Sequence, residues 1–362
     1  MRETRWPKTL ATKPDIGACM QRIDAWFEQA VIDRPPIRFS AHNAEYNAAR
    51  VLKDRSWPDL KSRWFDAEYQ IELFRESLKG RQFLAETFPV FWPNLGPEVY
   101  AAFYGGDLIF QEVTSYYVAS VHDWADADRL KLDMSNQYLR KLEEITRLAL
   151  QACEDQFLVG YSDLHAGVDC AAAWRDPQQF CMDLLLNPGE SKALIQKASA
   201  DFLTIYDHFD RILKEHGQLS VTWMAIPSCG RMHIPSCDFA ALISARHFVE
   251  FCLPVTLAEV THMTHNVFHV DGKGVAKNLD VLLQIPEIQA IQYVQGVGDD
   301  EPILQWLPQL KKIQRAGKSV MIDLQLHELE PLIQEMKPEG VLLSLEADPQ
   351  LQPEIIKRVA RW

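Results

Sequence analysis

The carboxyl-terminal part of the chain alternates between short apolar runs and amphipathic segments of helical length. From residue 219 onward this unit repeats about every thirty residues. Apolar runs of strand length lie at 219–225, 266–270, 290–294, 319–324 and 340–345. Segments of helical length lie at 245–264, 275–284, 303–316, 328–336 and 350–360. Strands that alternate with helices predict a parallel sheet with helical crossovers.

Three earlier apolar runs, at 88–92, 107–113 and 156–161, bring the predicted strands to eight. Eight such strands with helical crossovers predict an α/β fold of the (β/α)8 TIM-barrel type, with a doubly wound sheet as the alternative. A barrel takes roughly 250 residues, so we place it at 86–362. Residues 1–85 read as helices over 16–31 and 45–79, with a break near Pro58, and predict an N-terminal helical extension packed on the barrel.

Composition excludes several classes of protein. The formal net charge is −13 and no long basic cluster occurs, which argues against nucleic acid as a main partner. The seven cysteines form no CxxC pair, so a reducing, cytoplasmic setting is expected rather than a disulfide framework. No apolar run approaches the roughly 20 residues that a membrane span needs, and the first residues lack the apolar core of a signal peptide.

The segment 267–272 is the strongest candidate for chemistry. His269 and Asp271 are two residues apart on a predicted strand, so both side chains leave the same face of the sheet, just before Gly272. One imidazole nitrogen and one carboxylate directed into the same volume suit a metal ion or a proton-transfer pair. The plainer alternative is a buried histidine beside an aspartate that caps a turn.

Other polar residues gather at the predicted carboxyl ends of strands, where barrel enzymes place their active sites. Glu112 follows the run that begins at 107 and is one of these residues. Some of the others are expected to cap helices, because aspartate and serine are common there. The candidates for substrate contact are Asn94, Tyr161, Asp163, His165, Trp223, Arg231, Asp238 and Gln292.

Four segments resemble the uroporphyrinogen decarboxylase superfamily, which also contains the cobalamin-dependent methyltransferases. These segments are 105–112 (GGDLIFQE), 163–167 (DLHAG), 243–254 (ISARHFVEFCLP) and 268–272 (FHVDG). The resemblance implies a single (β/α)8 barrel with an additional N-terminal helical region. It also implies a small-molecule substrate and, for the methyltransferase branch, a corrinoid or folate co-substrate and a corrinoid protein as partner.

The chain departs from both branches of the superfamily. The decarboxylases carry an arginine-rich N-terminal segment that binds the substrate carboxylates, whereas the nearest stretch here, 43–50, supplies one arginine. The methyltransferases bind zinc through His-x-Cys and a later cysteine. Here His269-x-Asp271 takes the place of the first pair, and Ser344 or Glu346 is nearest to the last ligand, with Cys237 as a further candidate.

A metal set of His269, Asp271 and either Glu346 or Cys237 is therefore expected. With nitrogen and oxygen donors, such a set favours zinc with an open coordination position, or manganese or iron. Three functions follow as hypotheses. The first is a methyltransferase-like enzyme that moves a one-carbon group between a corrinoid or folate cofactor and a small acceptor. The second is a decarboxylase of uroporphyrinogen or a smaller carboxylate that uses Glu112, and the third is a binding protein that has lost the chemistry.

Overall fold

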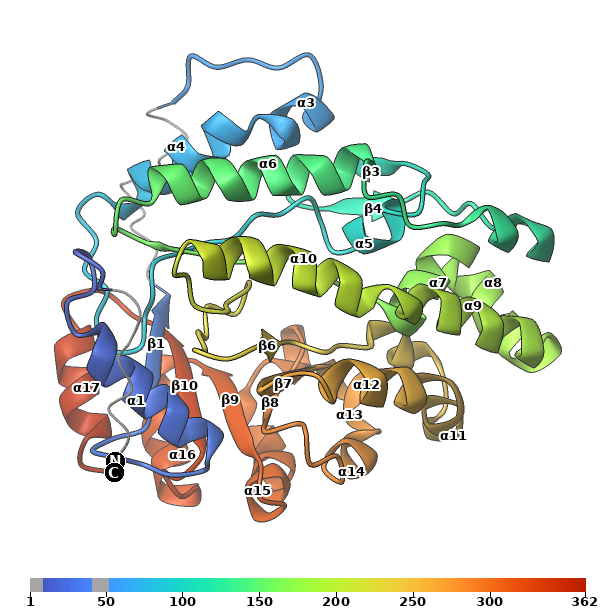
Figure 1. Ribbon diagram of the computed structural model, residues 1–362. Coiled ribbons are helices and arrows are strands. Elements are labelled where there is room, and N and C mark those ends of the chain that lie inside the picture. Colours follow the sequence, from blue (N-terminus) through green and yellow to red (C-terminus); the bar gives the residue numbers. More distant parts are fainter. Residues whose placement is uncertain (1–8, 41–51) are drawn as a thin grey trace.

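A curled, six-stranded parallel sheet forms the centre of the fold (Figure 1). The computed structural model describes residues 9–40 and 52–362. The strand order is β1-β10-β9-β8-β7-β6, with every neighbouring pair parallel. The strands are β1 (Ile37–Ser40), β10 (Val341–Glu346), β9 (Ser319–Leu324), β8 (Ala290–Val294), β7 (His265–Asp271) and β6 (Met232–His233).

Two small sheets complete the strand set in the described part of the chain. Strands β2 (Val90–Phe91) and β5 (Leu158–Val159) pair in parallel, whereas β3 (Leu108–Phe110) and β4 (Ser115–Tyr117) form an antiparallel hairpin. Single backbone hydrogen bonds connect the β2–β5 side to its neighbours: Glu86 donates to Ile37 over 2.8 Å and Tyr161 donates to Val221 over 3.0 Å. A closed eight-stranded barrel is not confirmed, because regular strand pairing joins only six strands into the main sheet.

The helices of the carboxyl-terminal half follow the predicted alternation. They are α11 (Ala245–His247), α12 (Leu253–Val260), α13 (Gly272–Ala276), α14 (Leu279–Leu282), α15 (Leu307–Arg315), α16 (Leu329–Glu335) and α17 (Gln352–Val359). A five-residue π-helix, Phe248–Cys252, joins α11 to α12. The predicted helical segments between residues 245 and 360 are thus confirmed in position, although several are shorter than expected.

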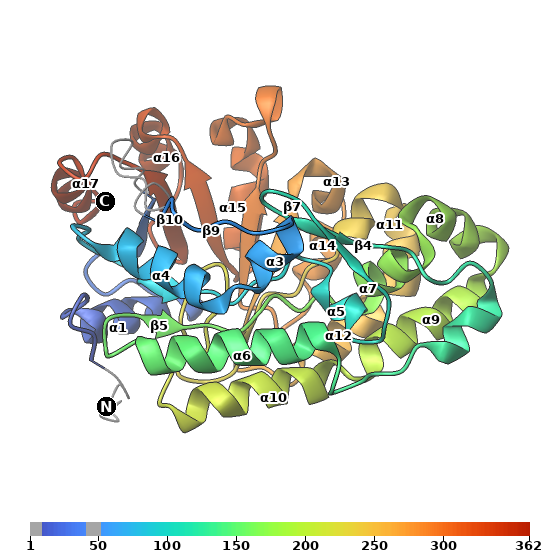
Figure 2. The ribbon, with the colours of Figure 1, turned by 90° about the horizontal axis from the view of Figure 1, so that it is seen from above.

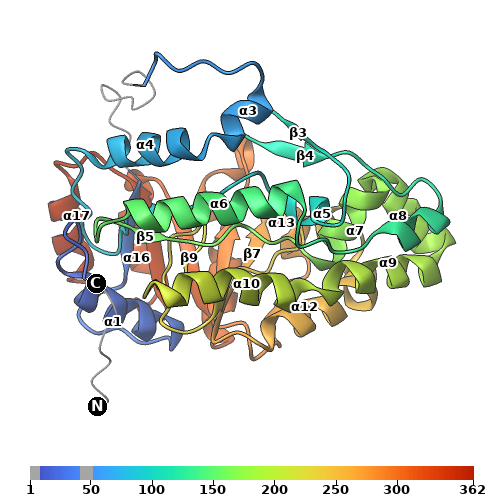
Figure 3. The same cartoon turned by 45° about the horizontal axis from the view of Figure 1, so that its top comes forward.

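The helices of the amino-terminal half are longer. They are α1 (Ile16–Phe27), α3 (Leu60–Phe65), α4 (Ala67–Leu78), α5 (Val99–Ala102), α6 (Gln137–Ala152), α7 (Gly167–Arg175), α8 (Pro177–Leu186), α9 (Pro188–Ala200) and α10 (Phe202–Glu215). Helices α6 and α10 run beside each other across the molecule (Figure 3). Helices α7, α8 and α9 form a lobe at the end opposite α1 and α17 (Figures 1 and 2).

Two runs do not form the barrel strands that were predicted, and one strand was missed. The run at 107–113 contributes only β3, which folds back on β4 through the turn closed by the Gln111 N–H and the Thr114 carbonyl, so it is not a barrel strand. The run at 219–225 has only an isolated bridge from Ser220 to Ser228, and Ala225 takes a positive φ of 54° that ends any strand. Strand β1, inside the predicted helical extension, pairs with β10 and was missed.

Two apolar clusters hold these layers together. The smaller one joins Val221 and Leu158 to Val267, Met321 and residues of α1, so it fills the concave side of the main sheet. Within it the buried Trp26 of α1 donates from its indole nitrogen to the Gly340 carbonyl over 3.0 Å. Burying one such large side chain stabilises a fold by roughly 1.5–3 kcal/mol, so α1 closes this core. The larger cluster packs the helices on the outer side. No helix in the described ranges has the length and apolar character to cross a membrane.

Candidate metal centre

Strand β7 ends in the His269-x-Asp271 pair that the sequence singled out. Val267, two residues before His269, belongs to the inner apolar cluster, whereas Phe268 and Val270 belong to the outer one. Alternation along the strand therefore directs His269 and Asp271 to the inner side at its carboxyl end, as expected. Gly272, at a φ of +65°, turns the chain at once into α13.

Asp238 approaches this pair from the neighbouring loop. Strand β6 pairs with the start of β7, and the His269 N–H then donates to the Pro235 carbonyl over 2.9 Å. The loop therefore runs along β7 until Asp238 opens the short 3-10 helix η2 (Asp238–Leu242). Asp169, in the first turn of α7, fixes this start by accepting the N–H groups of Asp238 and Phe239 over 3.1 and 2.9 Å.

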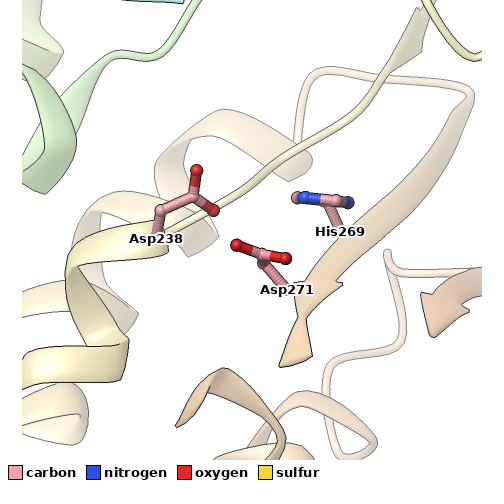
Figure 4. Close-up of side chains that lie close together, drawn as sticks. All are labelled: Asp238, His269 and Asp271. Atoms are coloured by element: carbon pink, nitrogen blue, oxygen red, sulfur yellow. The ribbon is translucent and has the colours of Figure 1, made fainter. Parts of the chain in front are cut away.

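The three side chains converge on one point (Figure 4). One ligand atom from each of Asp238, His269 and Asp271 lies within 4.8 Å of the other two. Neither carboxylate has a hydrogen-bond or ion-pair partner among the described residues, so two like charges face each other without a direct counter-ion. Removal from bulk water, together with the charge of Asp169, raises the pKa of Asp238 to about 6, although part of its surface meets solvent.

His269 is oriented by the next strand of the sheet. Its partner in register is Gln292 of β8, and the histidine Nδ1 lies 2.7 Å from the Gln292 Oε1. Because a carbonyl oxygen only accepts, Nδ1 carries the proton and Nε2 keeps its lone pair. The edge of the Trp223 ring packs against the imidazole, at 5.3 Å between centroids. A histidine held through its other nitrogen is the usual arrangement of a metal ligand.

The donor set fits a divalent cation. It offers one imidazole nitrogen and two carboxylates, and it contains no thiolate. Such nitrogen and oxygen donors suit zinc with an open position, manganese or iron(II). The structure thus brings Asp238, rather than Glu346 or Cys237, to the predicted His269–Asp271 pair.

A second polar cluster lies beside the first. His165 places Nε2 2.7 Å from an Asp163 oxygen and Nδ1 3.7 Å from an Asp169 oxygen, and the Ser236 hydroxyl lies 3.3 Å from Nδ1. Burial alone would lower the pKa of His165, but the two carboxylates outweigh it and raise the pKa well above its ordinary value. His165 is therefore a cation that bridges two anions, so both predicted substrate-contact residues, Asp163 and His165, lie in one polar cluster.

Asp169 was not among the predicted site residues. Its sequence signal was weak, because an aspartate in the first turn of a helix is ordinarily a helix cap. Here it instead connects His165 to the backbone that carries Asp238, so it joins the two clusters.

Two cavities open near these clusters. The smaller, of about 340 Å³, has Asp238 in its wall together with Glu98, His165, Asp169 and mostly apolar side chains. The larger, of about 790 Å³, lies at the carboxyl ends of β8, β9, β10 and β1. Its lining is Ser40, Gln295, Glu301, Asp323, Leu324, Gln325, Leu326, His327, Ser344 and Glu346.

Several predicted residues lie away from the Asp238–His269–Asp271 group. Glu112 sits in the turn of the β3–β4 hairpin, 74 % exposed, with its carboxylate 2.7 Å from Arg63. Arg231 precedes β6 at the opposite end of the sheet, where it pairs with Asp207 over 2.6 Å. The four residues from His265 to His269 put about 13 Å between that end and the candidate metal centre.

The remaining candidates have structural partners. The buried Tyr161 hydroxyl donates to the Met232 carbonyl over 2.7 Å, and the Asn94 side chain accepts the Gly96 N–H over 2.7 Å. The Cys237 thiol is buried against Cys252, which raises its pKa well above the ordinary value, so it does not face His269 as a thiolate. Glu346 ends β10, three strands from β7, and lines the larger cavity.

Comparison with known proteins gives a fold but no family. No protein-family profile matches the chain, and no curated protein sequence matches it. Among solved structures it is similar to a methyltransferase from Methanosarcina mazei, with a TM-score of 0.61 and 10 % sequence identity. The alignment covers 90 % of this chain and 92 % of that one. At this identity the likeness shows that the two proteins share an overall fold.

Proposed function

We propose that this protein is a methyltransferase-like enzyme with a divalent metal ion at Asp238, His269 and Asp271. The observation that carries the proposal is the convergence of three metal-ligating atoms within 4.8 Å, two of them on carboxylates without another partner. The methyltransferase-like fold supports the same reaction class. The reaction would move a one-carbon group between a corrinoid or folate cofactor, carried by a partner protein in the corrinoid case, and a small acceptor.

The chain's own residues have distinct roles in this proposal. Asp238, His269 and Asp271 hold the ion, and Gln292 keeps His269 in the tautomer that presents Nε2. Asp169 fixes the backbone of Asp238, and the His165 cation neutralises part of the nearby negative charge. When bound, a divalent ion supplies Lewis acidity that lowers the pKa of a coordinated acceptor group.

Decarboxylation of a porphyrinogen receives less support. A substrate with many carboxylates needs several cationic side chains, yet neither of the two cavities beside the clusters includes an arginine or lysine in its lining. Segment 43–50, the nearest stretch to the family's arginine-rich motif, lies outside the described residues. Glu112, the proposed acid/base of this alternative, is exposed and ion-paired with Arg63.

Metal binding to purified protein tests the proposal directly. Elemental analysis and calorimetric titration with Zn²⁺ and Mn²⁺ should give one site per chain in the unsubstituted protein. The His269→Gln variant should lose that site while its circular dichroism spectrum stays unchanged. His262→Gln, which alters an exposed histidine in the turn before β7, is the matched control and should keep the site.

Two outcomes would contradict the proposal. If His269→Gln bound Zn²⁺ or Mn²⁺ with undiminished stoichiometry and affinity, His269 would not be a metal ligand. Protein that takes up neither ion would leave His269 and Asp271 as an acid/base pair. Methyl transfer from a methylated corrinoid to a panel of thiols and amines then tests the reaction class, and the metal-free protein should be inactive.

A further inference from the structure

The smaller cavity differs in character from the larger one. Most of its wall is apolar. The small side chains are Pro97, Ala101, Ala172, Ala173 and Pro177, and the larger Phe239 and Leu242 complete the apolar lining. Its volume of about 340 Å³ is at the low end of the range for ligand pockets, so it suits a compact molecule. The wall comes from α5, α7, the start of α8 and η2, which places the cavity between the α7–α8–α9 lobe and the metal centre.

The charged groups that line this cavity are predominantly acidic. Glu98, Asp169 and Asp238 contribute carboxylates, and the lining includes no lysine or arginine. The only cation is His165, and its two ring nitrogens already face Asp163 and Asp169. An anionic ligand would therefore meet uncompensated negative charge, whereas a cation would be stabilised.

Glu98 is the carboxylate best placed to serve a ligand. Asp169 is occupied by His165 and by two backbone N–H groups, and Asp238 belongs to the metal centre. Glu98 accepts one backbone N–H, from Tyr117, through Oε2, and no hydrogen bond to Oε1 occurs among the described residues. Burial, together with the charge of Asp169, raises the pKa of Glu98, and the His165 charge and the Tyr117 N–H offset only part of that effect.

We propose that this cavity binds a small organic ammonium compound, with its cation beside Glu98 and its carbon chain against the alanine and proline wall. The inference rests on the proposed function, because it names the small substrate of the same reaction. Asp238 forms part of both the cavity wall and the metal centre, so a molecule in the cavity extends to the ligands of the ion. The larger, more polar cavity remains for a bulkier co-substrate.

Three probes of matched size and different charge test the proposal: butylammonium, butan-1-ol and butanoate. Their binding is measured on the full-length protein by calorimetric titration at neutral pH, with and without Zn²⁺. We expect butylammonium to bind at least tenfold more tightly than butan-1-ol, and butanoate to bind most weakly. Equal or tighter binding of the alcohol or the carboxylate would overturn the proposal.

Two variants separate the charge from the shape of the cavity. Glu98→Gln keeps an acceptor for the Tyr117 N–H, so the fold is retained, and it should reduce the preference for butylammonium over butan-1-ol to less than threefold. Glu190→Gln, at an exposed position of α9, is the matched control and should leave the preference unchanged. Ala173→Leu should weaken butylammonium and butan-1-ol alike, because it fills the cavity.

The two proposals fail in different ways. Loss of Zn²⁺ binding in His269→Gln with an intact ammonium preference keeps both assignments. Absence of Zn²⁺ binding in the unsubstituted protein would remove the metal centre but leave the measured charge preference standing. An ammonium preference that survives in Glu98→Gln would remove Glu98 as the recognition group even if the metal site is confirmed.

Discussion

The Asp271→Asn variant should have opposite effects on stability with and without a metal ion. In the metal-free protein, Asp238 and Asp271 repel each other across no more than 4.8 Å, and within residues 9–40 and 52–362 no cationic side chain forms an ion pair with either. Both carboxylates meet solvent, so a water-like dielectric applies, and the repulsion amounts to about 1 kcal/mol. Replacing one carboxylate by an amide removes this repulsion at nearly constant shape.

The expected changes in melting temperature follow from these energies. For a chain of this length, 1 kcal/mol corresponds to about 1 °C, so metal-free Asp271→Asn should melt about 1 °C above the unsubstituted protein. An ion at one hundred times its dissociation constant stabilises the folded state by about 2.7 kcal/mol. Zn²⁺ should therefore raise the melting temperature of the unsubstituted protein by about 3–4 °C, and the variant should then be the less stable of the two.

Scanning fluorimetry with chelated and Zn²⁺-loaded protein measures both differences. Asp128→Asn, an exposed aspartate on the 3-10 helix Trp124–Arg129, makes the same chemical change and should alter neither value. If Zn²⁺ raised the melting temperature of Asp271→Asn as much as that of the unsubstituted protein, Asp271 would not be a metal ligand. If the metal-free variant melted several degrees below the unsubstituted protein, Asp271 would be a structural residue.

Three further predictions concern stability and substrate range. Burial lowers the pKa of His265 to about 4. In the unfolded chain this histidine binds a proton below about pH 6.5, so the free energy of unfolding should fall by up to about 3 kcal/mol between pH 7 and pH 4. Urea unfolding of the His265→Phe variant should lack that fall. The carboxylate of Glu86 is fully buried and lies 2.6 Å from Arg34. The Glu86→Gln variant should therefore lower the free energy of unfolding by roughly 3–5 kcal/mol. A decrease under 1 kcal/mol in urea unfolding would contradict a structural ion pair. Incubation with uroporphyrinogen should yield no coproporphyrinogen by chromatography, and formation at an enzymatic rate would restore the decarboxylase hypothesis.

Strands β7 to β10 could be predicted from the sequence because each is a buried parallel strand. Such strands appear as continuous apolar runs, and a helical segment follows each of them. Strand β1 was missed because it has only four residues and directly follows Pro35 and Pro36, which weaken any strand pattern. The run around β3 was correctly read as a strand, but its antiparallel partner depends on a turn that residue type alone does not specify.

The candidate metal centre was predictable only where it is local in sequence. His269 and Asp271 share one strand, so the two-residue period places them together. Asp238 joins them through the register between β6 and β7 and through the Pro235–His269 hydrogen bond, neither of which is visible in the residues. Glu346 is not part of the Asp238–His269–Asp271 group, because β9 and β8 separate β10 from β7, three spacings of about 4.8 Å each along the sheet.

The distribution of charge around the candidate metal centre, and not only its set of ligand atoms, favours a bound cation. Asp163 and Asp169 face the His165 cation, whereas Asp238 and Asp271 lie close to each other without an ion-pair partner among the described residues, so these groups together keep an excess of negative charge. The proposed metal ion would pair with both Asp238 and Asp271, because each offers a carboxylate oxygen to the same point. The reversal of stability in Asp271→Asn is the direct physical signature of that proposal.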